Sequence, residues 1–592
     1  MNRLAQFTLL IALWALGSAT VGAAQRPIIE TAVIDGIMPG VTTNEELTRL
    51  WGDPRLESIH GNEIIRLYSM EPLNHIEVTL RGGLVRSIVI ELEMALPEID
   101  VRDSLSENLL RSKPVLIPDE AGNLLGQIFP ERGVIFMFSP ESTLRELYVE
   151  RIVVEPVSAE PFVIRAEAVL YNLPSESKQD LMNAVQLNPN HARAHWLLAQ
   201  IALWEGRVET AVQYIERAIQ QDEQRPAYHL TFAQALVQMN RIDEAKQYLQ
   251  ETIAISDRFP HERARALLLL GELYRTSRHP DHELALACHE EAIHLATTLF
   301  NHNNPTIRLT ARDVLFESHL AAAKVIAWGH WDLKEESINM WLDRARMLAS
   351  DPELMRAQRY SREHQFKIAA TALATLVALP DKTNIEGYIE NVIEAGNELI
   401  RTANDPILHI RHYWDTGVSL YDAMQIFQIR RQFSAALRYG ELAADYMEVG
   451  LRGRNSDTDW YLLGRLYFRL GAIHAIGNDN HRAAIEWYDR ALPIFERLLP
   501  KIDVGALGPF GETLVSMGMS YWMTGQQERA IALTETGLRQ LERGVRERVL
   551  DVAILEIPYL NLAKMYHDLR DHENAARYMR LASAIKADER MR

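Results

Sequence analysis

The sequence has one cysteine, Cys288, among its 592 residues. Internal disulfides, thiolate zinc sites and iron–sulfur clusters need more than one cysteine and are therefore excluded. Basic residues are also in deficit, because 62 Lys and Arg stand against 80 Asp and Glu and leave a formal charge of −18. A nucleic-acid partner requires a basic surface, so none is expected.

Long apolar runs are missing after the first 24 residues, so no transmembrane segment is expected in the rest of the chain. The N-terminus instead has the pattern of a secretory signal peptide, with Arg3, an apolar run over 7–16 and small residues over 17–24. Cleavage is expected after Ala23 or Ala24, and no cysteine is placed there to carry a lipid anchor. We predict an exported protein of the periplasm or cell envelope with residues 1–24 as signal peptide. An uncleaved N-terminal anchor is the alternative.

Motifs for phosphate binding and nucleophilic catalysis are missing as well, including Gly-x4-Gly-Lys-Ser/Thr, Gly-x-Gly-x-x-Gly and Gly-x-Ser-x-Gly. The nearest metal-binding pattern contains His289 and His294, but residues five apart point to different sides of a helix. We therefore predict no catalytic residues, no metal site and no cofactor, and a protein that is not an enzyme. An unrecognised active site within 26–156 or 305–405 is the alternative.

Strand-like alternation of apolar and polar residues is confined to residues 26–156. The expected order there is a helix over 43–51, strands over 64–68, 76–80 and 85–90, a helix over 104–110, and strands over 124–129, 134–138 and 149–154. The segments 85–91 and 149–155 match at an offset of 64 residues. We therefore predict a small α+β domain made of two helix-plus-meander halves.

The expected helix over 43–51 has signals at both ends. Thr43 and Glu46 have the spacing of a capping box, in which each residue satisfies a backbone N–H of the other. Gly52 supplies the stop, and the Asp53-Pro54 pair that follows cannot continue a helix.

Residues 37–54 (IMPGVTTNEELTRLWGDP) resemble the P-G-M-T…E…L-L-G-x-P segment of SmpA/OmlA (BamE-like) envelope domains. The resemblance extends over about 34–92. Those domains are small α/β modules that bind other proteins, some of them within the outer-membrane barrel assembly machine. The resemblance implies a protein-binding role in the envelope. Alternatively, Gly40, Gly52 and Pro54 serve only to begin and end a helix.

From residue 160 onward the pattern is helical, and small residues recur 12 positions apart. The pairs are Ala199/Ala211, Ala233/Ala245, Gly471/Ala483, Gly518/Ala530 and Ala563/Ala575, and seven positions after the first member come Gly206, Asn240, Asn478, Gly525 and Arg570. Small residues let two antiparallel helices approach closely, and a residue in the left-handed conformation ends the first helix. Each pair therefore predicts a helical hairpin.

The spacing from Ala199 to Ala233 is 34 residues, the period of the tetratricopeptide repeat (TPR), and residues 270–274 (LGELY) match its L-G-x2-Y element. The region 160–590 is therefore identified as a member of the TPR superfamily. We expect a mainly α protein, a right-handed α-α superhelix of about eight or nine helix pairs after the α+β domain. Its expected parts are 34-residue repeats over 160–300, degenerate repeats over 301–405, and repeats of 45–47 residues over 406–590.

In the TPR domains that this region resembles, fixed positions of the first helix of each pair line a concave groove. The residues at such positions proposed to bind a partner are Arg193, Trp196, Gln200, Trp204, Leu230, Gln234, Met519, Trp522, Lys564 and His567. The Lys/Asn/Arg set by which some relatives hold a terminal carboxylate is absent. Aromatic residues and Met favour an apolar or helical segment of a partner protein. The alternative is that each residue packs on the next repeat.

The predicted function is an exported, non-enzymatic scaffold that binds partner proteins through the groove of its repeats. A factor for outer-membrane assembly or secretion is a second hypothesis, and it depends on the SmpA/OmlA-like segment alone.

Overall fold

The computed structural model describes residues 29–70, 73–105, 112–119, 123–143, 145–277, 279–356, 358–379, 384–454, 456–502 and 504–589. The predicted signal peptide, residues 1–24, lies outside them. By packing, the chain divides into two compact units between Leu198 and Ala199.

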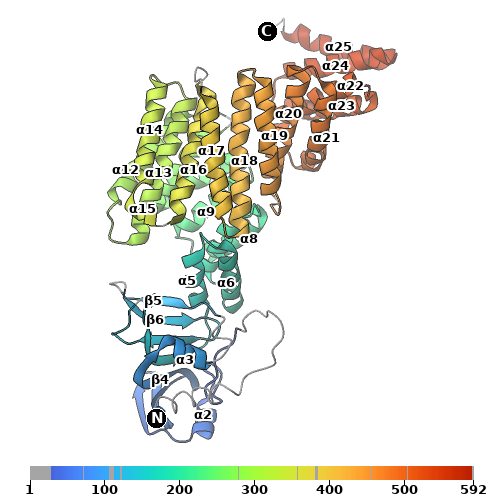
Figure 1. Ribbon diagram of the computed structural model, residues 1–592. Helices are drawn as coiled ribbons and strands as arrows, with labels where there is room; N and C mark the ends of the chain where they lie inside the picture. The colour runs from blue at the N-terminus through green and yellow to red at the C-terminus, as the bar shows by residue number, and fades with distance from the viewer. Residues whose placement is uncertain are drawn as a thin grey trace. The chain divides into compact units, whose positions relative to one another are not determined.

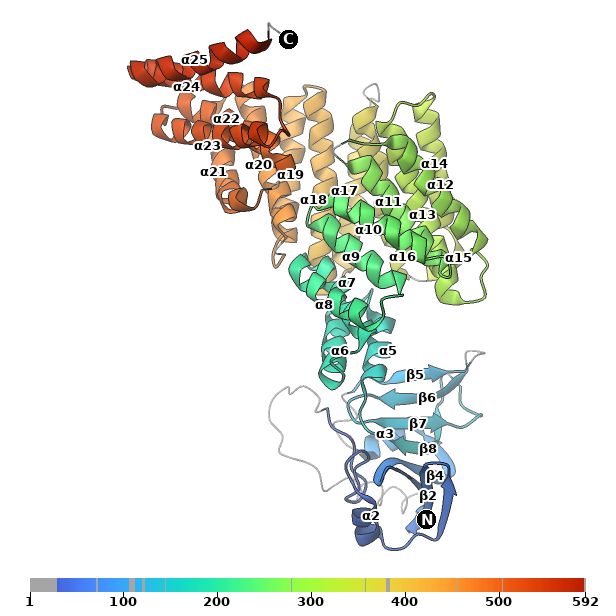
Figure 2. The ribbon, with the colours of Figure 1, turned by 180° about the vertical axis from the view of Figure 1, so that it is seen from behind.

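The first unit contains an antiparallel sheet of eight strands in the order β1-β2-β3-β4-β8-β7-β6-β5. The strands are β1 (Leu56–His60), β2 (Glu63–Met70), β3 (Leu73–Arg81), β4 (Leu84–Pro97), β5 (Val115–Pro118), β6 (Leu124–Phe129), β7 (Val134–Phe138) and β8 (Tyr148–Val154). Helix α2 (Asn44–Trp51) precedes the first four strands and α3 (Glu98–Leu105) precedes the last four. The two predicted helix-plus-meander halves are thus confirmed, and they join along β4 and β8 (Figure 2).

The two edge strands of the sheet, β1 and β5, were not predicted from the sequence. They have five and four residues, too few for a clear alternation of apolar and polar side chains. Helix α3 follows β4 directly and lies over 98–105, where no helix was predicted before residue 104. Most of the predicted helix over 104–110 lies outside the described residues. Residues 106–111 are outside the described part of the chain.

Helix α2 has the predicted ends. The Thr43 side chain accepts a hydrogen bond from the Glu46 N–H, and the Glu46 carboxylate accepts one from the Thr43 N–H at 3.0 Å. Gly52 ends the helix with φ +76°. The helix buries Leu47 fully and sets Trp51 edge-on to Tyr68 of β2, which fixes α2 against the sheet.

A buried ion-pair cluster joins the sheet to the first helix pair of the same unit. The Arg165 guanidinium lies 2.6 Å from Glu131, in the β6–β7 turn, and 2.6 Å from Asp180. The three side chains are 12%, 5% and 11% exposed. Burial opposes the charge of Arg165, but the two carboxylates outweigh it and raise its pKa.

The remainder of the described chain is helical (Figures 1 and 2). Its helices are α5 (Ala159–Val169), α6 (Pro174–Leu187), α7 (Ala192–Trp204), α8 (Val208–Gln221), α9 (Pro226–Gln238), α10 (Ile242–Ile255), α11 (Pro260–Thr276), α12 (His282–Thr298), α13 (Pro305–Trp328), α14 (Lys334–Ala349), α15 (Pro352–Arg356), α16 (Gln358–Thr375), α17 (Ile385–Thr402), α18 (Pro406–Ile429), α19 (Phe433–Gly450), α20 (Asp457–Ala472), α21 (His481–Leu498), α22 (Leu507–Met523), α23 (Gln527–Arg546), α24 (Glu556–Asp568) and α25 (His572–Glu589). None of the helices in the described ranges combines enough length and apolarity to cross a membrane.

Apart from short α15, these helices form ten successive pairs within the described residues, from α5/α6 to α24/α25. The sequence predicted eight or nine, because the region 301–405 holds two pairs, α13/α14 and α16/α17, without the small-residue signal. In α13/α14 the positions 12 apart are Ile326 and Ile338, which are 5% and 2% exposed. Leu333, seven positions after Ile326, has the left-handed φ of +51° that Gly or Asn has in other repeats.

Four of the five predicted turn residues are in the left-handed region, namely Gly206, Asn240, Gly525 and Arg570. The exception is the Gly471 hairpin, where Asp479 takes the positive φ of +50° and Asn478 has φ −117°. A π-helical turn over Ile473–Gly477 inserts one residue there. As a result, Ala484 and not the predicted Ala483 lies opposite Gly471, where it is fully buried.

Candidate partner-binding site

The first helices of successive pairs pack against one another in the middle of the second unit. Helices α11, α13, α16 and α18 form this row, which we call the first-helix layer. The partner helices α12, α14, α17 and α19 pack on its other side. Figure 2 labels all four helices of the row, and Figure 1 shows α13, α16 and α18 from the opposite direction.

Charged side chains follow the first-helix layer from one helix to the next. Lys324 of α13 lies 3.4 Å from Glu272 of α11, which also pairs with Arg275 at 2.7 Å. Further along, Lys367 of α16 pairs with Glu317 of α13. These contacts hold the layer together, while the side chains stay between 17% and 35% exposed. The layer therefore has a charged surface that solvent can reach.

Burial and neighbouring charges shift the pKa values in this layer in opposite directions. Burial would raise the pKa of Glu272, but Lys324 and Arg275 outweigh it and lower that pKa to about 2. Burial raises the pKa of Asp422 on α18 to about 6, because the same two cations offset it only in part. Burial opposes the charge of Lys367, yet its carboxylate neighbours raise its pKa.

A cavity of about 280 Å³ lies between α16, α17 and α18. Its charged lining comes from Glu363 and Lys367 of α16 and from Arg411 and Asp415 of α18, and its aromatic lining includes Phe366 and Trp414. Arg411 lies 3.5 Å from Asp415, whose side chain is 40% exposed. The cavity thus combines apolar walls with exposed charge, which is the composition of a binding site for a polar group on an apolar stem.

Next to the cavity, two distant parts of the second unit touch. Arg454 precedes α20 and donates a hydrogen bond of 3.2 Å to the carbonyl oxygen of Trp204, 250 positions earlier at the end of α7. Thr458 donates one of 2.7 Å to the carbonyl of Gln238 at the end of α9. The array from Trp204 to α20 therefore closes on itself, and we call the Arg454–Trp204 hydrogen bond the closing contact.

Aromatic rings connect the closing contact to the cavity. The Arg411 guanidinium lies 5.8 Å from the ring centroid of Trp204, and the Arg454 guanidinium lies 5.2 Å from that of Trp414. Arg454 is further held by Asp459 at 2.7 Å. A residue predicted for the groove, Trp204, is thus brought to the cavity by the closing contact.

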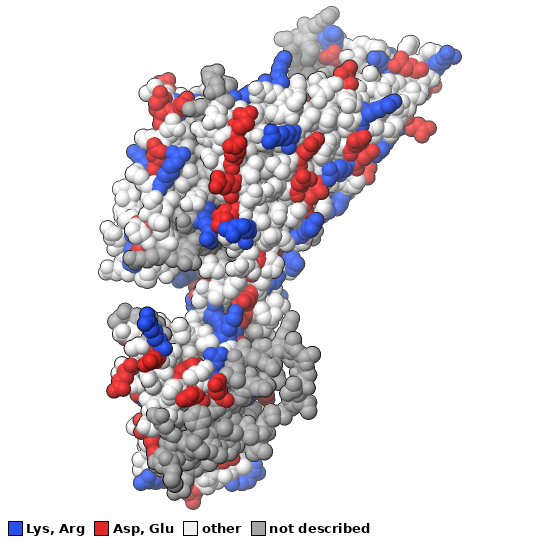
Figure 3. Space-filling model, in the orientation of Figure 1, with Lys and Arg blue, Asp and Glu red and all other residues white. Residues whose placement is uncertain are grey.

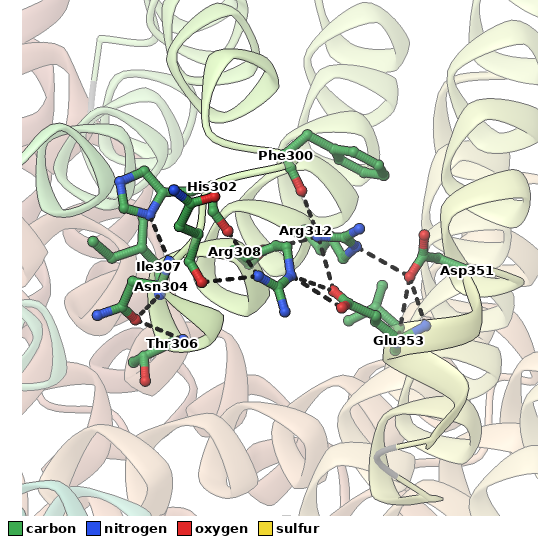
Figure 4. Close-up of polar contacts among 11 residues, drawn as sticks. Phe300, His302, Asn304, Thr306, Ile307, Arg308, Arg312, Asp351 and Glu353 are labelled. Atoms are coloured by element: carbon green, nitrogen blue, oxygen red, sulfur yellow. Dashed lines mark hydrogen bonds and ion pairs between the residues drawn. The ribbon is translucent and has the colours of Figure 1, made fainter. Parts of the chain in front are cut away.

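A second cluster of charges, shown in Figure 4, has a structural role. Arg312 of α13 is 6% exposed, stacks 4.0 Å from the Phe300 ring and donates to the Phe300 carbonyl at 2.6 Å. It also pairs with Asp351 at 3.1 Å and Glu353 at 3.0 Å, and Glu353 accepts from Arg308 at 3.0 Å. The cluster pins the connection before α13 to the corner between α14 and α15, and its charges are used within the chain.

The sequence-predicted groove residues have different surroundings. Leu230 is 3% exposed in a core with α10 and α11 residues, so it is not available to a partner and that prediction is corrected. Arg193 pairs with Glu167 and, at 3.1 Å, with Glu160. Gln234, Lys564 and His567 are exposed, and Trp196, Gln200, Trp204, Met519 and Trp522 are half-buried. Met519, Trp522, Lys564 and His567 belong to α22 and α24, away from the cavity-lining helices.

The charged residues of the layer were not predicted from the sequence. For α11 the signal was present, because the groove positions counted from Gly271 include Arg265, Glu272 and Arg275. For α13 and α16 no repeat was recognised in the sequence. The groove positions of these two helices, and therefore the charged residues at them, could not be assigned. Figure 3 shows both signs of charge interspersed over one face of the molecule. Among the described residues, no group of three or more His, Cys, Asp and Glu side chains is placed to hold a metal ion.

Comparison with known proteins identifies the helical repeats. A tetratricopeptide repeat family model matches residues 174–230 and 205–268, and a second one matches residues 558–589. A comparison with curated proteins finds no match.

Solved structures with a similar fold include the Cut9–Hcn1 hetero-tetramer of the APC/C, at 13% identity over 72% of this chain and 87% of that chain (TM-score 0.23). A Rap protein complexed with competence and sporulation factor is 13% identical over 67% and 98% (TM-score 0.34). The TPR domain of P58(IPK) is 14% identical over 66% and 96% (TM-score 0.18).

Proposed function

Because the helical part of this chain belongs to the TPR superfamily, we propose that the protein is an exported, non-enzymatic scaffold whose first-helix layer binds a partner polypeptide. The observation that carries the proposal is the cavity between α16 and α18, set in a layer of half-exposed charges.

The position of the cavity also supports binding. It lies in the middle of the array and beside the closing contact, where the helices on both sides are held in place. Binding sites on rigid elements lose less conformational entropy when a partner docks. The prediction that Trp196, Trp522 and Met519 bind an apolar segment of a partner protein still applies to the two ends of the array. The middle of the array, with its charged side chains, suits a polar segment.

Export is part of the proposal and depends on residues 1–24. The test is cell fractionation followed by mass spectrometry of the mature N-terminus. A chain that begins at Ala24 or Gln25 in the periplasmic fraction is the expected result. A full-length chain in the cytoplasmic fraction would contradict export.

Partner binding is tested by affinity capture from envelope extract with the full mature chain as bait. The variant Val418→Trp fills the cavity, because Val418 is half-buried in its lining. We expect the amount of the main captured protein to fall at least tenfold. The control Ala532→Trp places the same ring at an exposed position of α23 and leaves capture unchanged. Equal capture by both variants, at an unchanged melting temperature, would remove the cavity from the binding surface.

A second candidate function is a factor for envelope assembly or secretion, in which the sheet of the first unit contacts another protein. It is supported by the resemblance of the segment over 34–92 to SmpA/OmlA domains alone. Deletion of the gene is then expected to make cells sensitive to detergents and large antibiotics, and an intact barrier would count against this role.

A further inference from the structure

We propose that residues 25–28 (QRPI), which directly precede the first described residue, dock in a groove of the first unit between the edge strand β5 and the helices α5 and α6. The inference goes beyond partner binding by the repeats, because it concerns the other unit and an occupant that belongs to the chain itself. Signal cleavage, which is part of the proposed function, makes this segment the mature N-terminus.

The groove has a volume of about 950 Å³. Val115 and Leu116 of β5 form one side of it, and residues of α5 and α6 form the other. Within the described residues β5 pairs with β6 alone, so the second edge of β5 has no strand beside it. Leu116 and Ile164 of α5 are 50% and 39% exposed. The groove therefore combines an unpaired strand edge with apolar surface, which is what an extended segment of chain can cover.

The chain enters the first unit at this groove. Ile29, the first described residue, is part of the lining. The next residue is held beside it, because the Glu30 N–H donates a hydrogen bond of 2.9 Å to the Glu131 carbonyl. Four residues span at most about 14 Å when fully extended, so residues 25–28 stay close to the groove. Their attachment to a lining residue gives them an effective concentration on the order of millimolar there, and a weak affinity is enough to hold them.

The sequence of the segment suits a groove of this kind. Pro27 fixes its own φ and disfavours the helical conformation at Arg26, which favours an extended segment. Ile28 supplies an apolar side chain, and Leu116 and Ile164 belong to the apolar part of the lining. A segment whose conformation is restricted beforehand loses less entropy when it docks.

The charges agree with the same occupant. The segment is basic, because Arg26 and the α-amino group that cleavage leaves are both positive. The exposed carboxylate of the groove is Glu176 of α6, whose side chain is 47% exposed and lies 2.6 Å from the 71% exposed Lys113. The other two carboxylates of the lining are the buried partners of Arg165. Glu176 is therefore the carboxylate that Arg26 can reach without breaking a buried ion pair.

The test is hydrogen exchange, followed by mass spectrometry, on two forms of the full chain that begin at Gln25 and at Ile29. Both forms are produced without the signal peptide, so the result does not depend on export. We expect exchange in β5 and α6 to be at least about fivefold faster in the shorter form, and exchange in α22 and α24 to be the same in both. Equal exchange in β5 and α6 would overturn the proposal.

A third form separates the side chains of the segment from its length. Replacement of residues 25–28 by Gly-Ser-Gly-Ser keeps four residues in front of Ile29 and removes the proline, the apolar side chain and the basic one. We expect β5 and α6 to exchange as fast in this form as in the chain that begins at Ile29. Protection equal to that of the native segment would show that any four residues suffice and would overturn the assignment to this sequence.

A groove variant locates the docking site. Ala168→Trp places a large ring at an exposed position of the α5 lining and is expected to remove the difference between the forms that begin at Gln25 and Ile29. Ser69→Trp places the same ring at an exposed position of β2 and should preserve that difference. A difference that persists in Ala168→Trp would place the segment outside the groove and overturn the site. Partner capture does not enter these comparisons, so a failure of the proposed function is distinguishable from a failure of this inference.

Discussion

Val89 and Val153 lie directly opposite each other where β4 pairs with β8. The two residues are separated by 64 positions, the offset at which their segments match in sequence. At the same offset Ile88 corresponds to Ile152 and Ile90 to Val154. Each of these residues pairs with the equivalent of the other, because Ile88 lies opposite Val154 and Ile90 opposite Ile152. Equivalent positions of the two halves thus meet around a local twofold axis, and the eight-stranded sheet consists of two four-stranded halves joined along β4 and β8.

Removing Arg165 is expected to destabilise the first unit. Arg165→Ala leaves Glu131 and Asp180 buried without their cation, and breaking a buried ion pair costs about 3–5 kcal/mol. Urea unfolding followed by circular dichroism measures the change. Arg86→Ala, at an exposed position of β4, serves as the matched control and should change the free energy of unfolding by less than about 0.5 kcal/mol.

His289 is expected to weaken the fold as the pH falls. Its side chain is fully buried against Gly271, and burial lowers its pKa from 6.5 to about 4. Because the folded state prefers the neutral ring, its contribution to stability is complete above pH 6.5 and declines toward pH 4, by about 3 kcal/mol in total. His289→Leu should reduce this acid sensitivity in unfolding experiments between pH 7 and pH 4. The exposed control His294→Leu should leave it unchanged.

The extra residue of the π-helical turn should be removable. Ile476 is 80% exposed within Ile473–Gly477, so its deletion restores the seven-residue spacing from Gly471 to the left-handed turn and keeps the helices on both sides in register. We expect a folded protein with a melting temperature within a few degrees of the wild type. Deletion of Leu462, in the regular part of α20, rotates the preceding turns by about 100° and is expected to unfold the pair. Equal damage by the two deletions would show that the turn is required for the fold.

Arg454→Ala is expected to open the closing contact. The variant loses the hydrogen bond to the Trp204 carbonyl and leaves Asp459 without its cation, a change of about 2 kcal/mol. Hydrogen exchange should become faster at the ends of α7 and α9 and remain unchanged in α22 and α24. Arg452→Ala removes an exposed charge two residues away and serves as the control.

The parts of the fold that depend on local chemistry could be predicted from the sequence. Thr43 and Glu46 marked α2, and Gly206, Asn240, Gly525 and Arg570 marked turns, because each of these roles is fulfilled within a few residues. The second helix of the Gly471 hairpin was misplaced by one residue. A π-helical turn adds one residue to the connection, and the spacing of small residues does not reveal it. Strands β1 and β5 were missed because the pairing with β2 and β6, and not their own alternation, makes them strands.

The candidate site depends on contacts between helices far apart in the chain, and for that reason it was not predictable as a whole. Glu317, Lys367 and Arg411 are separated by 50 and 44 positions, and only the packing of α13, α16 and α18 brings them together. Trp204 was predicted as a groove residue from its position in a repeat. Its place beneath Arg411 follows from the closing contact, which no repeat pattern encodes.

The closing contact can form only late in synthesis, because its two residues are far apart in the chain. A chain that is synthesised from its N-terminus completes α7 before Arg454 has been made, because 250 positions separate Trp204 from Arg454. Until then, the ends of α7 and α9 lack the hydrogen bonds that Arg454 and Thr458 donate to them. Arg454 therefore sets the earliest point in synthesis at which the closing contact can form.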